Sequence, residues 1–175
     1  PYNQSKFFYQ PAVNIMIRQV KAEDAAQIAS IYNYYINETT VTFENEALSY
    51  REMKDRINAI NTCCPYFVYE ENGTILGYCY AHPWKERAAY AKTYEISIYL
   101  DKNANGKNIG TKLIQKLIEE CKKINCHALI ACITAENEGS IRFHLRHGFK
   151  QVSSFKEVGY KFNRYLDVND YELLF

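Results

Sequence analysis

The sequence predicts an α/β domain in which a mixed central sheet carries helices on both faces. Apolar residues make up 47% of the 175 residues, which is enough for one globular core. Segments with the alternation of half-buried strands are interspersed with segments of helical period, in the order β-α-α-β-β-β-α-β-α-β-β. Within one stretch, residues 93–121, the period changes from strand to helix across a short loop.

The first half of the chain carries two clear local signals. Ser49 and Glu52 form a capping-box pattern at the start of a helix, and Asn72-Gly73 is a strong hairpin turn. Residues 1–13 show no clear periodicity, and we expect them to form a tail that docks on the domain or on a second subunit. Residues 14–175 are expected to form a single domain. Its first half is expected to contain a strand over 15–20, helices over 24–36 and 49–60, and strands over 66–70 and 74–82.

The stretch 93–121 is expected to lie at the centre of the domain. In its strand part, Ile96, Ile98 and Leu100 share one face. From Gly110 onward, apolar residues recur at helical spacing, with lysines and glutamates on the other face. The rest of the chain is expected to contain a strand over 128–134, a helix that Asn137 caps and Gly148 ends, and strands over 149–158 and 160–174.

The loop 101–109 leads directly into a helix N-terminus. The first N–H groups of a helix are unpaired and the helix dipole is positive there, so such a site suits phosphate or pyrophosphate. Lys102, Lys107 and Lys112 add positive charge. The loop lacks the Gly-Lys-Ser/Thr of a P-loop and the third glycine of the dinucleotide fingerprint. From the spacing alone, an ordinary turn with solvated lysines is an equally good interpretation.

Composition and charge narrow the classes of function. The net charge is +1 and no run of five like charges occurs, which argues against a nucleic-acid or membrane-surface partner. The six cysteines form no C-x-x-C motif, so we interpret them as reduced core residues of a cytoplasmic protein. A metal site is the weaker alternative, because the four histidines are scattered without ligand spacing. We identify no signal peptide or membrane-spanning helix.

Several short motifs together resemble the GCN5-related N-acetyltransferases (GNAT), in particular the group that acetylates phosphinothricin and methionine sulfone or sulfoximine. The likeness covers residues 15–175. It implies a single N-acetyltransferase domain with a mostly antiparallel sheet of about seven strands. The motifs are Ile31-Tyr32-Asn33, Thr42-Phe43-Glu44, Gly77-Tyr78, Arg87-Ala88-Ala89-Tyr90, Glu95-Ile96-Ser97-Ile98-Tyr99, Asn105-Gly106-Lys107-Asn108-Ile109-Gly110, Asn137 with Ser140, His144, Gly148-Phe149 and Val158 to Asp167.

The resemblance implies a binding site for acetyl-CoA. The loop of Asn105, Gly106, Lys107, Asn108, Ile109 and Gly110 would bind its pyrophosphate, with Asn105 where Arg or Gln is usual and Asn108 where glycine is usual. Asparagine tolerates a left-handed backbone better than most residues, so the loop can keep its shape. The backbone of Ser97, Ile98 and Tyr99 would pair with pantetheine and polarise the thioester carbonyl. Asn137 would bond the pantetheine arm, or serve only as a helix cap.

The resemblance also implies acetyl transfer to an amine, which must first lose a proton because an aliphatic amine has a pKa near ~10. Glu95, an acidic residue in an apolar strand, is the candidate base, and burial would raise its pKa. The alternative is a Glu95 that faces solvent or only orients the substrate. His144 would protonate the leaving thiolate or assist Glu95, and a structural core histidine is an equally good interpretation.

The acidic part of the substrate would bind near Lys85, Glu86 and Arg87, since arginine can hold a carboxylate or phosphinate with two bonds. A solvated loop is the alternative, above all for Lys85. Phe43 would line the substrate pocket, or act as a packing residue.

The leading hypothesis is direct acetyl transfer, in a ternary complex, to the amine of a small amino-acid-like substrate. No cysteine is placed to suggest an acyl-enzyme. Acetylation of a peptide or another amine is one alternative. An inactive CoA-binding sensor, suggested by Asn105 and Asn108, is another. A homodimer is expected only by resemblance.

Overall fold

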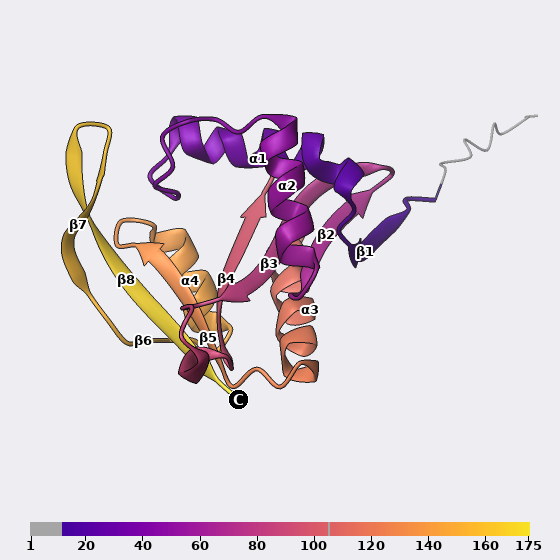
Figure 1. Ribbon diagram of the computed structural model, residues 1–175. Coiled ribbons are helices and arrows are strands. Elements are labelled where there is room, and N and C mark those ends of the chain that lie inside the picture. Colours follow the sequence, from indigo (N-terminus) through magenta and orange to yellow (C-terminus); the bar gives the residue numbers. More distant parts are fainter. Residues whose placement is uncertain (1–11, 105) are drawn as a thin grey trace, which may run out of the picture.

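The computed structural model describes residues 12–104 and 106–175 and shows one sheet between two layers of helices (Figure 1). Eight strands form the sheet, in the order β1-β2-β3-β4-β5-β8-β6, and β7 pairs with β8 outside this path. The pairs are antiparallel except β4 with β5, which are parallel. The predicted mixed, mostly antiparallel sheet with helices on both faces is confirmed. The elements are β1 (Ile15–Gln19), η1 (Ala22–Asp24), α1 (Ala25–Glu38), α2 (Tyr50–Asn61), β2 (Tyr66–Glu71), β3 (Thr74–Pro83), η2 (Ala88–Tyr90), β4 (Thr93–Leu100), α3 (Ile109–Lys123), β5 (Ala128–Thr134), α4 (Glu138–Arg146), β6 (Lys150–Gln151), β7 (Phe155–Lys161) and β8 (Arg164–Leu174).

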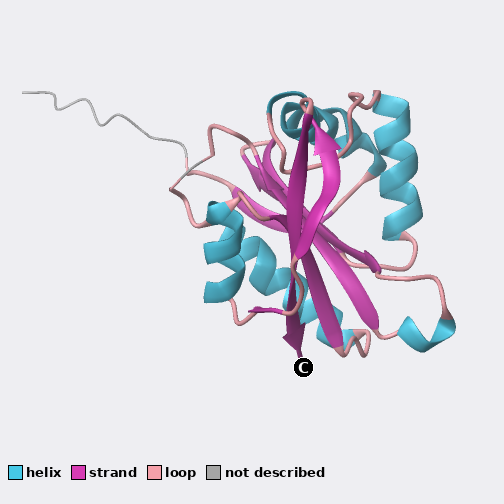
Figure 2. Ribbon diagram, turned by 90° about the vertical axis from the view of Figure 1, so that its left-hand side faces the viewer, coloured by secondary structure: helices cyan, strands magenta, loops and turns pink. Residues whose placement is uncertain are grey.

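Helices lie on both sides of the sheet (Figure 2), and each face of the sheet has its own hydrophobic core. On one face, Ile28 of α1 and Ile57 of α2 pack with Val68 and Tyr78 of the sheet. The opposite face packs against α3 and α4. Successive residues of a strand point to opposite faces, so β4 contributes to both layers. As predicted, Ile96, Ile98 and Leu100 share the α3–α4 face.

Two local signals in the first half of the sequence have the predicted structure. The Ser49 hydroxyl accepts a hydrogen bond from the Glu52 N–H at 3.2 Å, and the Glu52 carboxylate accepts one from the Ser49 N–H at 2.7 Å. Asn72 and Gly73 have left-handed φ values of 51° and 82° between β2 and β3. Both positions therefore adopt the backbone that a two-residue hairpin turn requires.

The predicted late strands were wrong in their bounds. The expected strand 149–158 is divided into the two-residue β6 and the start of β7, and the turn lies at Phe162-Asn163, not at Gly159. Phe162 and Asn163 have φ values of 51° and 58°, a left-handed turn that phenylalanine rarely adopts and that the sequence therefore did not reveal. Gly159 lies inside β7, where it is buried. The described part of the chain thus forms a sheet of eight strands, where about seven were expected.

The proposed tail, residues 1–13, lies outside the described residues apart from Ala12 and Val13. Within the described ranges, none of the helices combines the length and the apolar character needed to span a lipid bilayer. The same part of the chain contains no group of three or more His, Cys, Asp or Glu side chains arranged to hold a metal ion.

Candidate active site

The centre of the sheet opens where β4 and β5 separate. Residues 93–95 of β4 pair with residues 128–130 of β5. Beyond Glu95, β4 continues beside β3 as far as Leu100, while β5 continues beside β8 as far as Thr134. The backbone of residues 96–100 therefore has no strand on its β5 side, and its polar groups on that edge face a gap. We call this gap the fork.

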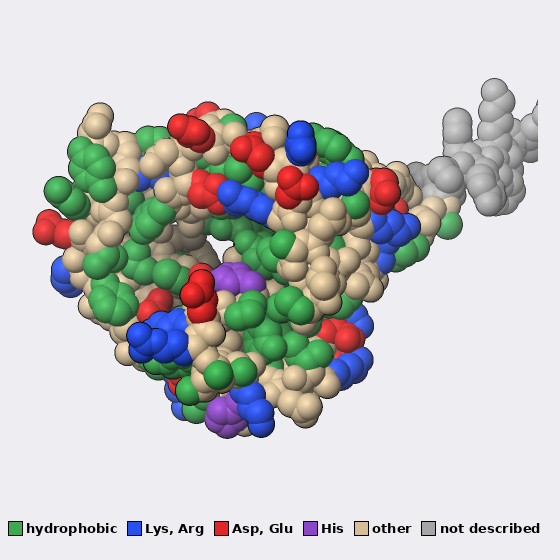
Figure 3. All heavy atoms as spheres, viewed as in Figure 1, with side chains coloured by type: hydrophobic (Ala, Val, Ile, Leu, Met, Phe, Trp, Pro, Cys, Tyr) green, Lys and Arg blue, Asp and Glu red, His purple; other side chains and the backbone are tan. Residues whose placement is uncertain are grey.

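A cavity of about 280 Å³ occupies the fork. Its lining includes Glu95, His144, Ser97, Tyr99 and Phe43, which come from β4, α4 and the loop after α1. Figure 3 shows an opening on this side of the molecule, below the layer of α1 and α2, with a histidine side chain at its rim. The fold therefore brings together both predicted catalytic residues, a part of the predicted cofactor strand and one predicted substrate residue.

Glu95 is half-buried and lies at the point where the fork begins. It shares a face of β4 with Tyr99, which packs against the α1–α2 core. Burial raises the pKa of the Glu95 carboxyl above its ordinary value. His82, which lies on β3 opposite Glu95, acts to lower this pKa, and nearby Asp170 acts to raise it. A carboxylate with a raised pKa is a better proton acceptor, so the site suits a general base.

His144 is only 3% exposed, although it lines the cavity. Its Nδ1 lies 2.8 Å from the backbone oxygen of Ser140. A carbonyl oxygen can only accept, so Nδ1 carries the hydrogen and Nε2 presents a lone pair. Burial lowers the pKa of His144, which keeps the ring neutral near pH 7. His144 is therefore set up to accept a proton before it can donate one.

A groove of about 640 Å³ continues from the cavity toward the start of α3. The groove and the cavity share Ile98, Tyr99, Asn137 and Ser140 in their linings, so the two spaces adjoin each other. Farther along, the groove is lined by side chains and backbone of β4, α1, α3 and α4. These include Tyr35, Leu100, Gly110 and Phe143. The Tyr35 hydroxyl donates to the Leu100 carbonyl at 2.6 Å and so holds α1 against the end of β4.

The start of α3 has the backbone that the sequence predicted. Asn108 caps the helix in the left-handed conformation, with φ 56° and ψ 24°. The helical ladder begins with the Lys112 N–H donating to the Asn108 carbonyl at 3.1 Å. The amides of residues 109–111 precede this bond and are directed out of the helix end. Gly110 lies in the groove lining, so the start of α3 borders the groove.

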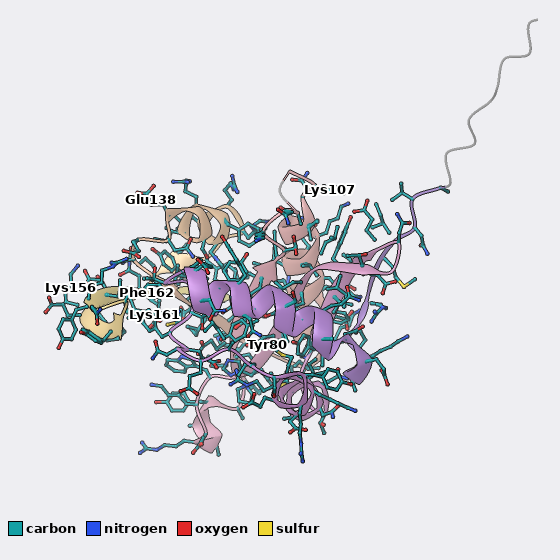
Figure 4. The ribbon with its side chains drawn as sticks, turned by 90° about the horizontal axis from the view of Figure 1, so that it is seen from above. Tyr80, Lys107, Glu138, Lys156, Lys161 and Phe162 are labelled. Atoms are coloured by element: carbon teal, nitrogen blue, oxygen red, sulfur yellow. The ribbon has the colours of Figure 1, made fainter. Side chains whose placement is uncertain are left out.

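The remaining residues around the predicted loop differ in their contacts and in whether they line the groove. The Lys107 ammonium pairs with Glu71 at 2.8 Å, so its side chain is directed to β2 (Figure 4). Asn105 lies outside the described residues. Lys102 and Arg146 line the groove. The role of Arg146 was missed in the sequence, because only the fold brings the end of α4 beside α3.

Asn137 has a structural role that the sequence predicted. Its side-chain oxygen accepts a hydrogen bond from the Ser140 N–H at 3.2 Å and caps α4. It also lines both the cavity and the groove. Its helix-cap role is thus confirmed, and its contact with pantetheine stays a prediction.

Lys85, Glu86 and Arg87 are exposed on the connection between β3 and β4, and the cavity lining does not include them. The Lys85 ammonium lies over the Trp84 ring, 4.0 Å from its centroid. The connection leaves β3 one residue after His82, which does line the cavity. These three residues therefore lie beyond the His82 edge of the cavity, not inside it.

Cys132 lines the cavity, which the sequence did not indicate. Cys132 is accessible to solvent, and partial desolvation, together with Asp170 and Glu95, raises the pKa of its thiol to about 12. The thiol therefore stays protonated at neutral pH, and a protonated thiol is a poor nucleophile.

The family model described as acetyltransferase (GNAT) domain matches residues 17–169. This chain belongs to the GNAT acetyltransferases. A phosphinothricin N-acetyltransferase of Streptomyces coelicolor is 33% identical over 162 residues, which cover 90% of this chain and 95% of the relative. An L-methionine sulfoximine/L-methionine sulfone acetyltransferase of Salmonella typhimurium is 32% identical, and the match covers 90% of this chain and 92% of that protein.

The fold of this GNAT acetyltransferase also matches solved structures. A phosphinothricin acetyltransferase of Sinorhizobium meliloti, solved in complex with acetyl-CoA, is 32% identical with a TM-score of 0.87, and the match covers 91% of this chain and 88% of that one. The fork and the groove therefore belong to a member of a family that uses acetyl-CoA as the acetyl donor.

Proposed function

We propose that this protein transfers an acetyl group from acetyl-CoA to the α-amine of a small amino-acid-like acceptor of the phosphinothricin or methionine sulfone type. The observation that carries this proposal is the pair of adjoining spaces, the groove at the start of α3 and the cavity at Glu95. The relatives named above support the class of acceptor. Residues 14–175 would form a single N-acetyltransferase domain.

The residues along this space fit acetyl-CoA, which supplies the acetyl group as a thioester. The amides of residues 109–111 would hold the pyrophosphate at the helix N-terminus. The free edge of β4 at Ser97, Ile98 and Tyr99 would pair with the pantetheine amides as a neighbouring strand does, and Asn137 would bond the same arm. Arg146 lies in the groove and adds a positive charge suited to phosphate.

Glu95 would take the first proton, from the acceptor ammonium, directly or through a water molecule. The neutral amine then forms the C–N bond with the acetyl carbon while the C–S bond breaks. The Nε2 atom of His144 would take the second proton, which the amine nitrogen loses as the bond forms, and return it to the thiolate. This assignment uses the lone pair that the Ser140 contact leaves on Nε2.

Transfer is proposed to be direct, without an acyl-enzyme. The cavity-lining Cys132 stays protonated, which disfavours it as a nucleophile. Phe43 would contact the acceptor side chain. Lys85, Glu86 and Arg87 remain proposed contacts for the acidic group of the acceptor, at the His82 edge of the cavity.

One assay tests the proposal. The protein is incubated with acetyl-CoA and each of phosphinothricin, methionine sulfone, common amino acids and short peptides, and free thiol is followed. We expect turnover of the amino-acid-like acceptors, with the highest kcat/KM for one of the first two. Turnover of peptides alone would favour a peptide acetyltransferase. Binding of acetyl-CoA without turnover of any amine would favour the sensor alternative and contradict the proposal.

We further propose a cytoplasmic homodimer. All six cysteines, each in the described part of the chain, are free thiols, which supports a reducing compartment. The β7–β8 hairpin exposes Val158, Tyr160 and Tyr165, whose exposed fractions are 60%, 55% and 64%. Contiguous apolar side chains of this kind support a protein contact surface.

A further inference from the structure

The strand β7 turns two different faces to its surroundings. Val158 and Tyr160 face outward and are exposed, whereas Gly159 and Lys161 face inward and are buried. Gly159 lies opposite Leu166 of β8, and Figure 4 shows Lys161 on the side of the hairpin that faces α1. The inward residues meet the loop 39–49, whose residues Thr42 and Phe43 line the cavity at the fork.

The Phe43 ring packs directly on the backbone of Gly159. A Cβ atom at position 159 would lie 2.3 Å from Cε2 and 2.5 Å from Cζ of Phe43. Real Cβ atoms do not approach so closely, so any side chain at this position would displace the ring. The φ angle of Gly159 is outside the left-handed region, so the backbone conformation alone would allow another residue. Glycine therefore leaves the ring in its present position, and a Cβ atom would require the ring to shift.

Hydrogen bonds hold the loop backbone on both sides of Val41. The Lys161 ammonium donates to the Thr42 carbonyl at 2.8 Å, and the Thr134 hydroxyl donates to the Thr40 carbonyl at 2.7 Å. The Thr42 hydroxyl also bonds that of Tyr32 at 2.8 Å. Because the backbone is held, the Phe43 side chain is the part that must yield to a new Cβ. Phe43 belongs to the cavity lining, so a shift of its ring changes the wall of the cavity.

We propose that Gly159 is a specificity-determining residue: by letting Phe43 rest against β7, it sets how long an acceptor side chain the cavity admits. The inference rests on the proposed function, since the acceptor is an amino-acid-like amine with an apolar side-chain stem. Gly159 itself does not line the cavity and acts through Phe43.

A double-mutant cycle tests this inference. The unmodified protein, Gly159→Ala, Phe43→Ala and the double variant are assayed with alanine, norvaline, methionine and methionine sulfone as acceptors. We expect Gly159→Ala to lower kcat/KM for the longest acceptor by about 10-fold more than for the shortest one that is acetylated. Without the ring, Gly159→Ala has nothing to displace, so the double variant should show the same selectivity as Phe43→Ala. Lys156→Ala, on the exposed side of the same strand, is the matched control and should leave the selectivity unchanged.

Two results would overturn the inference. One is a loss of kcat/KM in Gly159→Ala that is equal for all acceptors. The other is an effect of Gly159→Ala that persists in the Phe43→Ala background. If the unmodified protein acetylates none of the acceptors, the proposed function fails, and crystal structures of the two proteins still decide the inference. A Phe43 ring that is unmoved in Gly159→Ala overturns it, and a ring shifted into the cavity supports it.

Discussion

At the scale of single residues, the two candidate catalytic groups have opposite pKa shifts with one main cause. Burial raises the pKa of the Glu95 carboxyl and lowers that of the His144 imidazole. In both cases the low-dielectric environment disfavours the charged form. The imidazole is therefore neutral at pH 7 and has a free lone pair, and the carboxylate binds a proton more readily than an exposed one does. This suits a reaction in which two protons leave one nitrogen.

We expect Glu95→Gln to lower kcat by at least ~100-fold, because it removes the proposed base and keeps the shape of the side chain. In the unmodified protein, kcat/KM should fall on the acidic side at a pH above the ordinary glutamate value, since the folded pKa is raised. That limb of the pH profile should be absent in the variant. A variant with the full rate would contradict the base assignment.

The same substitution has an expected effect on stability. A carboxyl whose pKa is raised on folding gives its full stabilising contribution below its unfolded pKa, and this contribution is lost as the pH rises through the folded value. At pH 7 an ionised Glu95 therefore destabilises the folded state, and glutamine at this position does not. The melting temperature of Glu95→Gln should therefore equal or exceed that of the unmodified protein at pH 7. The difference should shrink as the pH is lowered to 4. A lower melting temperature at pH 7 would mean that the carboxylate has a stabilising contact.

At the scale of elements, the first turn of α3 depends on a left-handed asparagine. Asn108 and Asn125 have almost the same φ, 56° and 58°, at the two ends of this helix. Only Asn108 lies at the end of α3 whose Gly110 lines the groove. A comparison of the same substitution at the two positions therefore distinguishes the effect of backbone strain on stability from an effect on coenzyme binding.

We expect Asn108→Val and Asn125→Val each to lower the free energy of unfolding by roughly 1–2 kcal/mol, because a β-branched residue is strained in this conformation. Only Asn108→Val should weaken acetyl-CoA binding, which titration calorimetry measures. Asn108→Gly should keep both properties near those of the unmodified protein. Equal losses of affinity in the two valine variants would show that the helix start has no special role.

Sequence reasoning succeeded for elements whose signals are local. Asn72-Gly73, the Ser49 capping box and the Asn137 cap all depend on contacts within a few residues, and all three are present. The turn at Phe162-Asn163 was missed because phenylalanine carries no preference for it. Pairing with β8 imposes that turn. Gly159 was expected to separate two strands, because its contact with Phe43 joins residues that are far apart in the chain and leaves no local signal.

The site residues likewise differ in whether local sequence signals indicate their position. Glu95 and the start of α3 could be predicted because they belong to one continuous stretch. Cys132 and Arg146 could not, because β5 and α4 reach the fork and the groove only through the order of strands in the sheet. Lys85 and Arg87 show the converse. Their charge suggested a binding role, yet the fold leaves them on an exposed connection.

At the scale of the whole molecule, the hairpin of β7 and β8 joins the cavity to a surface. Its inner face supports Phe43 through Gly159, and its outer face exposes Val158 and Tyr160. A second copy that covers the outer face would therefore press on the strand that supports the cavity wall. Association and selectivity for the acceptor would then be linked through one strand.

The unmodified protein should sediment as a dimer at micromolar concentration, and Tyr160→Asp should shift it toward the monomer, because a buried unpaired carboxylate opposes association. Tyr50→Asp is the matched control: Tyr50 is also an exposed tyrosine, 48% accessible, but lies on α2. The control should remain dimeric. A monomeric unmodified protein would contradict the proposed homodimer, and dissociation of both variants would contradict the choice of the hairpin as its surface.

The three-residue contact between β4 and β5 has a consequence for how the chain folds. The strands β2, β3 and β4 follow one another and pair in that order, so each closes a short loop. The contact of β4 with β5 must wait for the crossover through α3, and loop-closure entropy makes such non-local pairs slow to form. A nascent chain that has not yet paired β5 has no fork. Competence to bind the coenzyme would therefore arise late in folding and all at once, and would report that the chain has reached its final topology.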